Sequence, residues 1–247
     1  MHEIETLALV GATFFLAGAV KGVVGLGLPT VSLAVLTATI GLPQAMALLL
    51  APSLATNLWQ ALAGGHGRAV LRRTWPFLAL ATGTVWIGAL ALTRIDVALL
   101  SAMLGALLIL YAAMSLTGVK IVVPPGREVW AGPALGTING LLTGMTGSFV
   151  VPGVLYLQAI GLGRDMLIQA MGMLFAASAL ALAVALGGNG LLTAELGLAS
   201  ILAILPAVAG MIAGQHLRKR MPDALFRRVF FLSLLALGGY IVLRSMM

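Results

Sequence analysis

The 247-residue chain has no cysteine, only three histidines and few charged residues. Without cysteine it has no disulfide, no thiolate metal site and no cysteine nucleophile. The histidines, His2, His66 and His216, are too scattered to predict a metal-binding cluster, and we expect no cofactor. Charged residues make up 9% of the chain, against about 25% in a typical soluble protein. That is too few to cover the surface of a soluble domain of this length.

Apolar sequence is present in excess, since hydrophobic residues make up 61% of the chain and the mean hydropathy is +1.10. A membrane-spanning helix needs about 20 apolar residues. Six segments meet that requirement: 43–63, 75–93, 97–117, 165–186, 196–216 and 223–243. We therefore predict an all-α polytopic protein whose partner is the lipid bilayer. The chain has a net charge of +7, but its lysine and arginine residues lie mostly between the apolar segments, as in the loops of a membrane protein. We therefore do not expect nucleic acid to bind.

Two further apolar segments, 6–40 and 131–161, are too long for one helix each. Glycine interrupts both near the middle, first at Gly25-Leu26-Gly27 and then around Gly147. Non-helical backbone at membrane depth is tolerated only inside protein or beside a water-filled cavity. We therefore expect the functional site at these two breaks.

Three glycine motifs recur in the same order at offsets of 120 to 123 residues. The pairs are Gly18-x3-Gly22-x2-Gly25 with Gly140-x3-Gly144-x2-Gly147, Ile40-Gly41-Leu42 with Ile160-Gly161-Leu162, and Gly64-Gly65-x-Gly67 with Gly187-Gly188-x-Gly190. A constant offset over three motifs indicates a tandem duplication. We predict a first transmembrane repeat over 1–117, a linker over 118–130 and a second transmembrane repeat over 131–247.

The positions of lysine and arginine distinguish two topologies. If each broken segment crosses the membrane once, these residues divide six to seven between the two sides. If each broken segment is a hairpin, eleven fall on one side, and only Arg94 and Arg244 fall on the other. The eleven are Arg68, Arg72, Arg73, Lys120, Arg127, Arg164, Arg218, Lys219, Arg220, Arg227 and Arg228. The positive-inside rule therefore predicts two inverted repeats, each a glycine-broken helical hairpin followed by three transmembrane helices, with both termini outside.

Inverted repeats with broken helices are a recurring transporter architecture in which the substrate binds near the membrane midplane. We expect the hairpin tips, Gly25-Leu26-Gly27 and Thr146-Gly147-Ser148, to approach each other there. Half-helices that begin at the tips would point their N-termini at the substrate, which favours an anion. Lys21 is ionisable and lies inside an apolar segment, so we expect it to hold the anion's charge rather than to snorkel to an interface.

The remaining candidate contacts are glycines, hydroxyls and amides near the breaks. We expect Gly18 and Gly140 to pack helices closely, and Gly25, Gly27 and Gly147 to form turns whose N–H groups face the substrate. Hydroxyl and amide side chains can form hydrogen bonds within the helix bundle instead of contacting the substrate. Among the amides, we consider Gln60 a weaker candidate for substrate binding than Asn57 and Gln169. The predicted substrate-binding residues are Lys21, Gly25, Gly27, Thr30, Asn57, Thr146, Gly147, Ser148 and Gln169.

The first glycine motif, Ala17 to Gly27, its weaker copy, Gly140 to Ser148, and the duplicated layout resemble the sulfite exporter (TauE/SafE) family. The resemblance implies a permease of the bacterial inner membrane for small sulfur-containing anions such as sulfite, sulfoacetate or related organosulfonates. The sequence departs from the family's usual motif at Leu28-Pro29, where a further glycine is common, and at Ser148-Phe149, where a glycine pair is common.

Three other functions are alternatives to a permease. An anion channel would share every feature except alternating access. An intramembrane serine hydrolase would need a histidine at the depth of Ser148, but His66 lies in a loop and His216 at a segment end, so we expect no enzyme. A purely structural subunit would not need broken segments. The sequence leaves open the particular anion, the direction of transport, the coupling ion and homo-oligomer formation.

Overall fold

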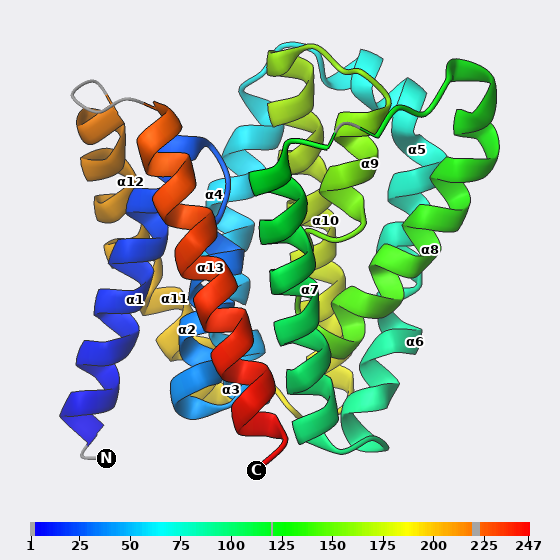
Figure 1. Cartoon of the computed structure of the whole chain (residues 1–247). Helices are drawn as coiled ribbons and strands as arrows, with labels where there is room; N and C mark the ends of the chain where they lie inside the picture. The colour runs from blue at the N-terminus through cyan, green and yellow to red at the C-terminus, as the bar shows by residue number, and fades with distance from the viewer. Residues whose placement is uncertain (1–2, 120, 219–222) are drawn as a thin grey trace. The chain divides into compact units, whose positions relative to one another are not determined.

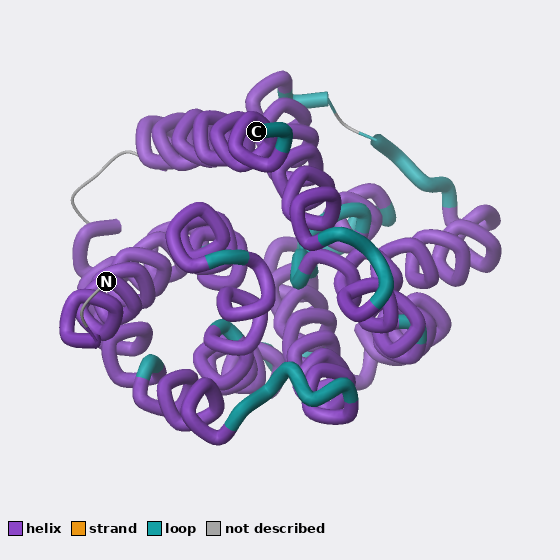
Figure 2. Tube along the Cα trace, turned by 90° about the horizontal axis from the view of Figure 1, so that it is seen from below, coloured by secondary structure: helices purple, strands orange, loops and turns teal. Residues whose placement is uncertain are grey.

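The computed structural model describes residues 3–119, 121–218 and 223–247. In these residues the chain forms helices joined by loops, and no strand is drawn (Figure 2). Three cations of the predicted topology, Lys120, Lys219 and Arg220, lie outside the described residues. The predicted all-α architecture is confirmed.

Five of the six predicted spans are helices or nearly continuous helical runs (Figure 1). They are α5 to η1 (Gly67–Gly83, Val85–Ala89 and Leu90–Thr93), α7 (Val97–Thr117), α10 (Arg164–Gly188), α11 with α12 (Ala194–Leu202 and Ile204–Arg218) and α13 (Asp223–Ser245). In the described part of the chain, six helices are long and apolar enough to cross a membrane, and a bent pair raises the number to seven. The chain is a multi-pass membrane protein.

The remaining predicted span, 43–63, is broken rather than continuous. It consists of α3 (Leu42–Leu48) and α4 (Leu50–Leu62), which are bent by 43°. Pro52 has no N–H to donate to the carbonyl of Leu48, so the helical ladder is interrupted there. The buried hydroxyl of Ser200, on α11, donates to the Leu48 carbonyl at 2.8 Å and accepts from the Ala51 N–H at 3.0 Å. One side chain thus satisfies two backbone groups at the break.

Both predicted glycine breaks are present. The first separates α1 (Glu3–Val24) from α2 (Leu28–Ile40), and the second separates α8 (Glu128–Thr146) from α9 (Gly153–Ala159). A short helix, η2 (Pro125–Arg127), precedes α8. The first arm of each hairpin is long: α1 has 22 residues and α8 has 19, or about 33 and 28 Å. Both arms therefore approach the thickness of a bilayer's hydrocarbon core.

The helices form two compact units, each built from segments of both sequence halves. Unit 1 comprises Met1–Pro52, Asp96–Gly118 and Thr193–Met247, and unit 2 comprises Ser53–Ile95 and Val119–Leu192. The predicted boundaries at 117 and 131 describe a duplication in sequence, which this spatial division does not test, so they stay a prediction.

Equivalent glycines make the same kind of contact in each unit. In unit 1, α1 runs parallel to α12, and a Cβ on Gly22 would lie 2.2 Å from the Met211 carbonyl oxygen. In unit 2, α8 runs parallel to α5 and α6, and a Cβ on Gly144 would lie 2.2 Å from the Val85 carbonyl oxygen. Gly18 and Gly140 are equally tight, at 2.0 and 2.1 Å. The packing role predicted for Gly18 and Gly140 is confirmed.

Helices α7 and α13, the last helix of each predicted repeat, lie side by side in unit 1 (Figure 1). Gly105 faces Gly238 and Val242, whereas Tyr111 stacks edge-on against Phe231 at 5.4 Å, so the two helices are antiparallel. Parallel repeats would run these helices in the same direction, and inverted repeats require opposite directions. The pairing agrees with inverted repeats, whose orientation in a membrane stays a prediction.

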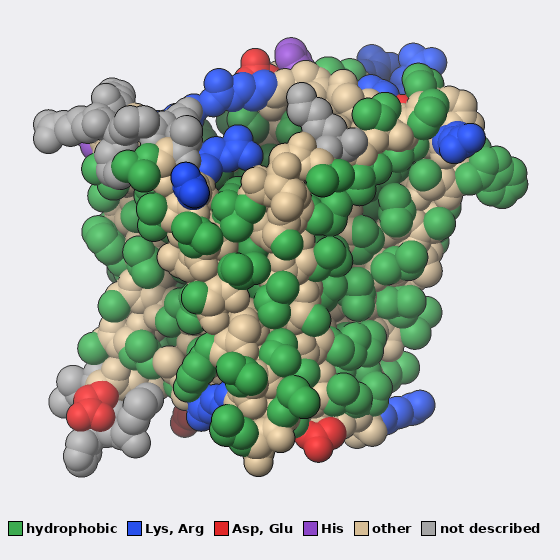
Figure 3. Space-filling view, viewed as in Figure 1, with side chains coloured by type: hydrophobic (Ala, Val, Ile, Leu, Met, Phe, Trp, Pro, Cys, Tyr) green, Lys and Arg blue, Asp and Glu red, His purple; other side chains and the backbone are tan. Residues whose placement is uncertain are grey.

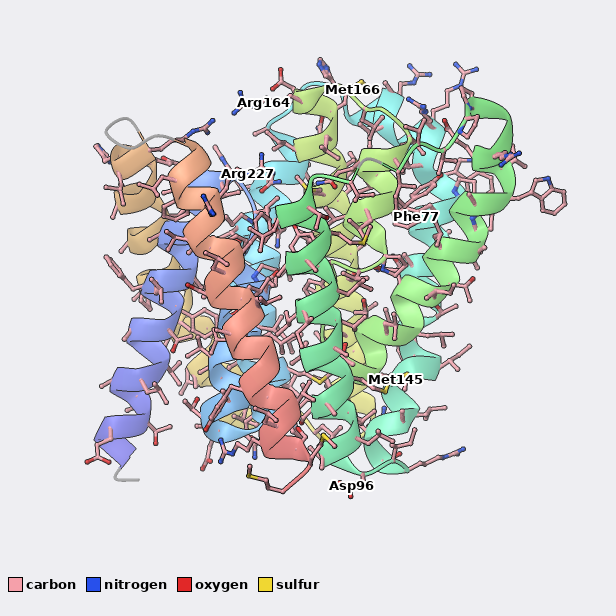
Figure 4. All side chains as sticks on the ribbon, viewed as in Figure 1. Phe77, Asp96, Met145, Arg164, Met166 and Arg227 are labelled. Atoms are coloured by element: carbon pink, nitrogen blue, oxygen red, sulfur yellow. The ribbon has the colours of Figure 1, made fainter. Side chains whose placement is uncertain are left out.

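Cationic side chains gather at one end of each unit. In unit 1, Arg227 and Asp96 lie at opposite ends (Figure 4), and Arg218 ends α12 near the start of α13. In unit 2, Arg73 joins the starts of α5 and α8 through an ion pair with Glu128 at 2.6 Å. Arg68, Arg72, Arg127 and Arg164 also lie near the starts of α5, α8 or α10. Between the ends, hydrophobic side chains dominate the face seen in Figure 3.

We expect Gly22→Ala to lower the free energy of unfolding by about 1–3 kcal/mol, because the new methyl would force α1 away from α12. Gly11→Ala is the matched control on the same helix, since a Cβ at Gly11 would meet no atom within 4 Å. The control should be neutral or stabilising by up to about 1 kcal/mol. Denaturation in detergent micelles measures both variants, and equal effects would contradict glycine-mediated packing.

Candidate functional site

The first break is a tight turn made by two glycines. Gly25 and Gly27 have φ angles of +83° and +111°, which glycine adopts without steric cost. The Gly25 N–H donates to the Lys21 carbonyl at 2.7 Å and closes the end of α1. A Cβ on Gly27 would lie 3.0 Å from the side chain of Val20 and 3.4 Å from that of Phe230. Gly27 therefore packs against both α1 and α13.

The start of α2 lies nearer the cationic end of unit 1 than its middle. Phe230, which flanks Gly27, is seven residues after the first residue of α13, and seven helical residues span about 10 Å. Since α13 has 23 residues, or about 34 Å, α2 begins well short of halfway along it. Phe230, the residue of α13 that contacts Gly27, is also about one helical turn after Arg227.

The N-terminus of α2 presents unused donors. Its first backbone bond runs from the Val31 N–H to the Gly27 carbonyl at 2.8 Å, so the N–H groups of Leu28 and Thr30 precede the helical ladder. Pro29 has no N–H to leave unpaired, as expected for the first turn. The hydroxyl of Thr30 is buried and has no hydrogen-bond partner among the described residues, and Thr37, on the same face of α2, is in the same state. The Ser32 hydroxyl, by contrast, donates to the Leu28 carbonyl at 2.8 Å.

Lys21 lies in the last turn of α1, and the residue is only 5% exposed. A snorkelling lysine would extend its ammonium to the surface, and this one is buried instead. Four predicted residues, Lys21, Gly25, Gly27 and Thr30, are thus brought together around one break. Burying an ammonium is costly unless other groups stabilise its charge, so this position favours a functional role.

The second break differs in how its polar groups are used. Gly147 has φ +73° and caps α8, with its N–H donating to the Thr143 carbonyl at 2.8 Å. The Thr146 hydroxyl donates to Leu142 at 2.6 Å and accepts from the Ser148 N–H at 3.3 Å. The glycine turns expected at Gly25 and Gly147 are present, but their N–H groups close the preceding helices rather than remaining open, because a left-handed C-cap bonds back one turn.

The half-helix after the second break does not begin at the tip as predicted. Residues 147–152 are non-helical, and the Val151–Pro152 peptide is cis. Helix α9 starts at Gly153 and has seven residues. Its first N–H groups are already bonded, Gly153 to the Asn139 side chain at 2.9 Å and Val154 to the Val150 carbonyl at 2.7 Å. The helix-dipole argument for an anion therefore applies to α2 and not to α9.

Gln169 joins α10 to the turn between α4 and α5. Its side-chain nitrogen donates to the Ala61 carbonyl at 2.6 Å, and its side-chain oxygen accepts from the His66 N–H at 2.8 Å. This turn precedes α5, whereas the tip of α8 lies beside α6, where Gly144 meets Val85. About 20 residues of helix, or about 30 Å, separate the two places. The structure does not bring Gln169 to Thr146, Gly147 and Ser148.

Asn57 is fully buried on α4, and its side-chain nitrogen donates to the Ser53 hydroxyl at 3.0 Å. Its backbone carbonyl faces Gly172 of α10, so it belongs to the α4–α10 contact that also holds Gln169. The two predicted tips lie in different units, Gly25-Leu26-Gly27 in unit 1 and Thr146-Gly147-Ser148 in unit 2. Their approach to each other stays a prediction.

Asn139, which the sequence analysis overlooked, is a further polar residue near the second break. It is fully buried on α8, and its side-chain nitrogen has no partner among the described residues. The repeat offset of 122 places Ala17 at the equivalent position of the first half. The sequence did contain a signal for this residue, since Asn139 is an amide within an apolar segment and the equivalent residue of the first half is an alanine. The described residues contain no group of three side chains suited to hold a metal ion.

Apolar helices interrupted at glycine-containing breaks are typical of a polytopic membrane protein of the kind used for transport. The model of the sulfite exporter TauE/SafE family matches residues 10–241, and the chain belongs to this family. Membership makes the protein a membrane transporter of sulfite-type anions. Comparisons with curated proteins and with solved structures gave no match.

We expect Gln169→Leu to lower the free energy of unfolding by about 1–3 kcal/mol, because it leaves the Ala61 carbonyl and the His66 N–H without partners. The matched control is Gln158→Leu at an exposed position of α9, which should change stability by less than about 0.5 kcal/mol. Denaturation in micelles measures both. A neutral Gln169→Leu variant would refute the role of this side chain in holding the turn.

Proposed function

We propose that the protein binds a small sulfur-containing anion, such as sulfite or an organosulfonate, at the break between α1 and α2 and moves it by alternating access. The observation that carries the proposal is the buried start of α2, where two N–H groups precede the helical ladder beside the unpartnered hydroxyl of Thr30. Lys21, buried one turn before the break, supplies positive charge.

These groups suit an anion for three reasons. The N-terminus of a helix carries partial positive charge and exposed N–H donors. A lysine ammonium and a threonine hydroxyl add further donors for the oxygen atoms of an oxyanion. All seven acidic residues of the chain lie in the first turn of a helix or immediately before it: Glu3, Glu5, Asp96, Glu128, Asp165, Glu195 and Asp223. Each acidic residue is therefore placed at or before the start of a helix rather than in the middle of a span.

Alternating access needs two bodies that can rearrange around a bound substrate. Two compact units, each held together by close glycine contacts, support that mechanism. The antiparallel pairing of α7 with α13 supports inverted repeats, from which the inward-facing and outward-facing states of many transporters arise. An anion channel could have the same architecture and would differ only in that it does not alternate between inward-facing and outward-facing states.

The positions of the cationic residues also suggest how the protein is oriented in its membrane. We place the cationic end of each unit on the cytoplasmic side of a bacterial inner membrane, with both chain termini outside, because positive residues favour the cytoplasmic side. The anion site at the start of α2, about 10 Å from the cationic end of α13, then lies nearer the cytoplasm than the periplasm. Homo-oligomer formation is not required by this mechanism.

The test is anion-dependent stabilisation of the purified protein against heat, with sulfite, sulfate, thiosulfate, sulfoacetate and chloride compared in turn. A ligand that binds only the folded state at 100 times its Kd adds about 2.7 kcal/mol of stability. We expect selective stabilisation by one sulfur oxyanion or sulfonate, its loss in Lys21→Ala, and its retention in the control Arg94→Ala, which removes an exposed cation. No selectivity, or an unchanged response in Lys21→Ala, would contradict the proposed site.

Counterflow in proteoliposomes then separates the two modes of transport. A carrier exchanges labelled anion faster when unlabelled anion is present on the opposite side, because the loaded site returns more readily than the empty one. We expect such acceleration for the anion that stabilises the protein. Flux that is indifferent to the opposite side would favour the channel instead.

A further inference from the structure

We infer that the starts of α5 and α8, both in unit 2, form a binding site for the headgroup of an anionic phospholipid. The site consists of three exposed arginines, Arg68, Arg72 and Arg127, and an exposed tryptophan, Trp130. All four residues belong to unit 2. The inference therefore does not depend on which anion the protein transports.

An ion pair holds two of these arginines close together. Arg73 donates to both carboxylate oxygens of Glu128, at 3.0 and 2.6 Å, and so joins the start of α5 to the start of α8. Arg72 and Arg127 are the chain neighbours of this pair, and adjacent Cα atoms are 3.8 Å apart. The backbones of Arg72 and Arg127 therefore both adjoin the ion pair.

The positive charge at this end of unit 2 is not balanced by carboxylates. Glu128 neutralises Arg73. The exposed side chains of Arg68, Arg72 and Arg127 form no hydrogen bond or ion pair within the described part of the chain. Arg68 precedes Arg72 by one helical turn, so the two share one face of α5. Three positive charges thus gather where the helices begin, and this arrangement favours an anionic ligand.

The register of α5 against α8 places Trp130 at the depth of these arginines. The two helices run parallel, and a Cβ on Gly136 would lie 2.5 Å from the Phe77 carbonyl oxygen. Six residues earlier on each helix, Trp130 is level, within a helical turn, with Leu71. Leu71 is the chain neighbour of Arg72, so the tryptophan and the arginine lie at the same depth.

Trp130 has the surroundings that tryptophan prefers at a membrane–water boundary. Its side chain is 81% exposed in the first turn of α8, and Ala134 and Ile138 continue its face as exposed apolar residues. On α5, Trp75 follows Arg72 by one turn and is 60% exposed. Tryptophan is enriched at the headgroup level, where its ring is apolar and its N–H can donate. Both helices therefore show arginine, then tryptophan, then apolar surface.

This order matches the structure of a phospholipid. A phosphate group accepts charge-assisted hydrogen bonds from arginine, and its acyl chains can extend along the apolar surface beyond the tryptophan. Figure 3 shows Lys and Arg side chains at the upper right, over the starts of α5 and α8, with hydrophobic side chains below them. A free phosphate would use the arginines alone and leave Trp130 without a contact.

The test is quenching of Trp130 fluorescence by brominated lipids in vesicles that contain both phosphatidylglycerol and phosphatidylcholine. The full-length protein keeps Trp130 as its single tryptophan, with Trp59, Trp75 and Trp86 replaced by phenylalanine. Two matched preparations carry the bromine on one lipid or on the other, and bromine quenches only at short range. A second single-tryptophan protein, which keeps the exposed Trp86 of α6 instead, is the control.

We expect Trp130 to prefer phosphatidylglycerol by at least about fivefold, since one arginine near an anionic surface contributes about that factor. Combining Arg72→Gln with Arg127→Gln should reduce the preference to about one. Arg164→Gln removes an exposed cation from the start of α10 and should retain the preference. Trp86 should show none, and added salt should weaken the preference at Trp130.

Equal quenching of Trp130 by the two lipids, or a preference that survives Arg72→Gln with Arg127→Gln, would overturn the inference. Quenching by neither lipid would also overturn it, since water or a second protein molecule would then cover Trp130. Native mass spectrometry needs no tryptophan replacement and decides the question if the single-tryptophan protein does not fold. Phosphatidylglycerol should stay bound to wild type and be lost from the double arginine variant, and equal retention would contradict the site.

Discussion

The whole structure depends on the rule that backbone polar groups inside a membrane must find partners within the protein. Among the described residues, the bend between α3 and α4 and the breaks after α1 and α8 each retain hydrogen bonds to backbone groups that the helical ladder does not serve or that close the preceding helix. Ser200 serves the carbonyl and the N–H at the bend between α3 and α4, the Lys21 carbonyl receives the Gly25 N–H, and Asn139 receives the Gly153 N–H. Among the described residues, a buried donor without a partner, such as the Thr30 hydroxyl, marks a place where a ligand is expected.

Close glycine packing gives each unit its internal structure. Lipid chains are as apolar as the side chains that face them, so helices associate through close contact rather than through the hydrophobic effect. Gly22 and Gly144 allow backbone to meet backbone in units 1 and 2 respectively, in parallel helix pairs built from opposite halves of the chain. The same kind of glycine contact is thus used in both units, as the predicted duplication would require. The polar residues Lys21 and Asn139 lie on α1 and α8, the two helices that are packed this way.

Composition and hydropathy were sufficient to predict the helical membrane fold, the spans and the two glycine breaks, because these depend on sums over many residues. The bend at Leu49 was missed because an average over 20 residues does not register one proline. Gln169 was predicted to bind the substrate because an amide has the same chemistry in a turn as in a site. The structure shows that it bonds across the turn before α5, and its contact with a substrate stays a prediction. The start of α9 at Gly153 was not predicted, and its first N–H bonds to Asn139, a contact between residues 14 apart that no local pattern encodes.

We propose that the anion binds inside the membrane at the break between α1 and α2 rather than at the arginines of the cationic ends. The most direct measurement is the position of bound selenite, a heavier analogue of sulfite, located by the anomalous scattering of selenium in crystals of the protein. We expect a selenium peak within hydrogen-bonding reach of the start of α2 and the Thr30 hydroxyl. Selenium found only beside exposed arginines such as Arg68 and Arg164 would contradict it.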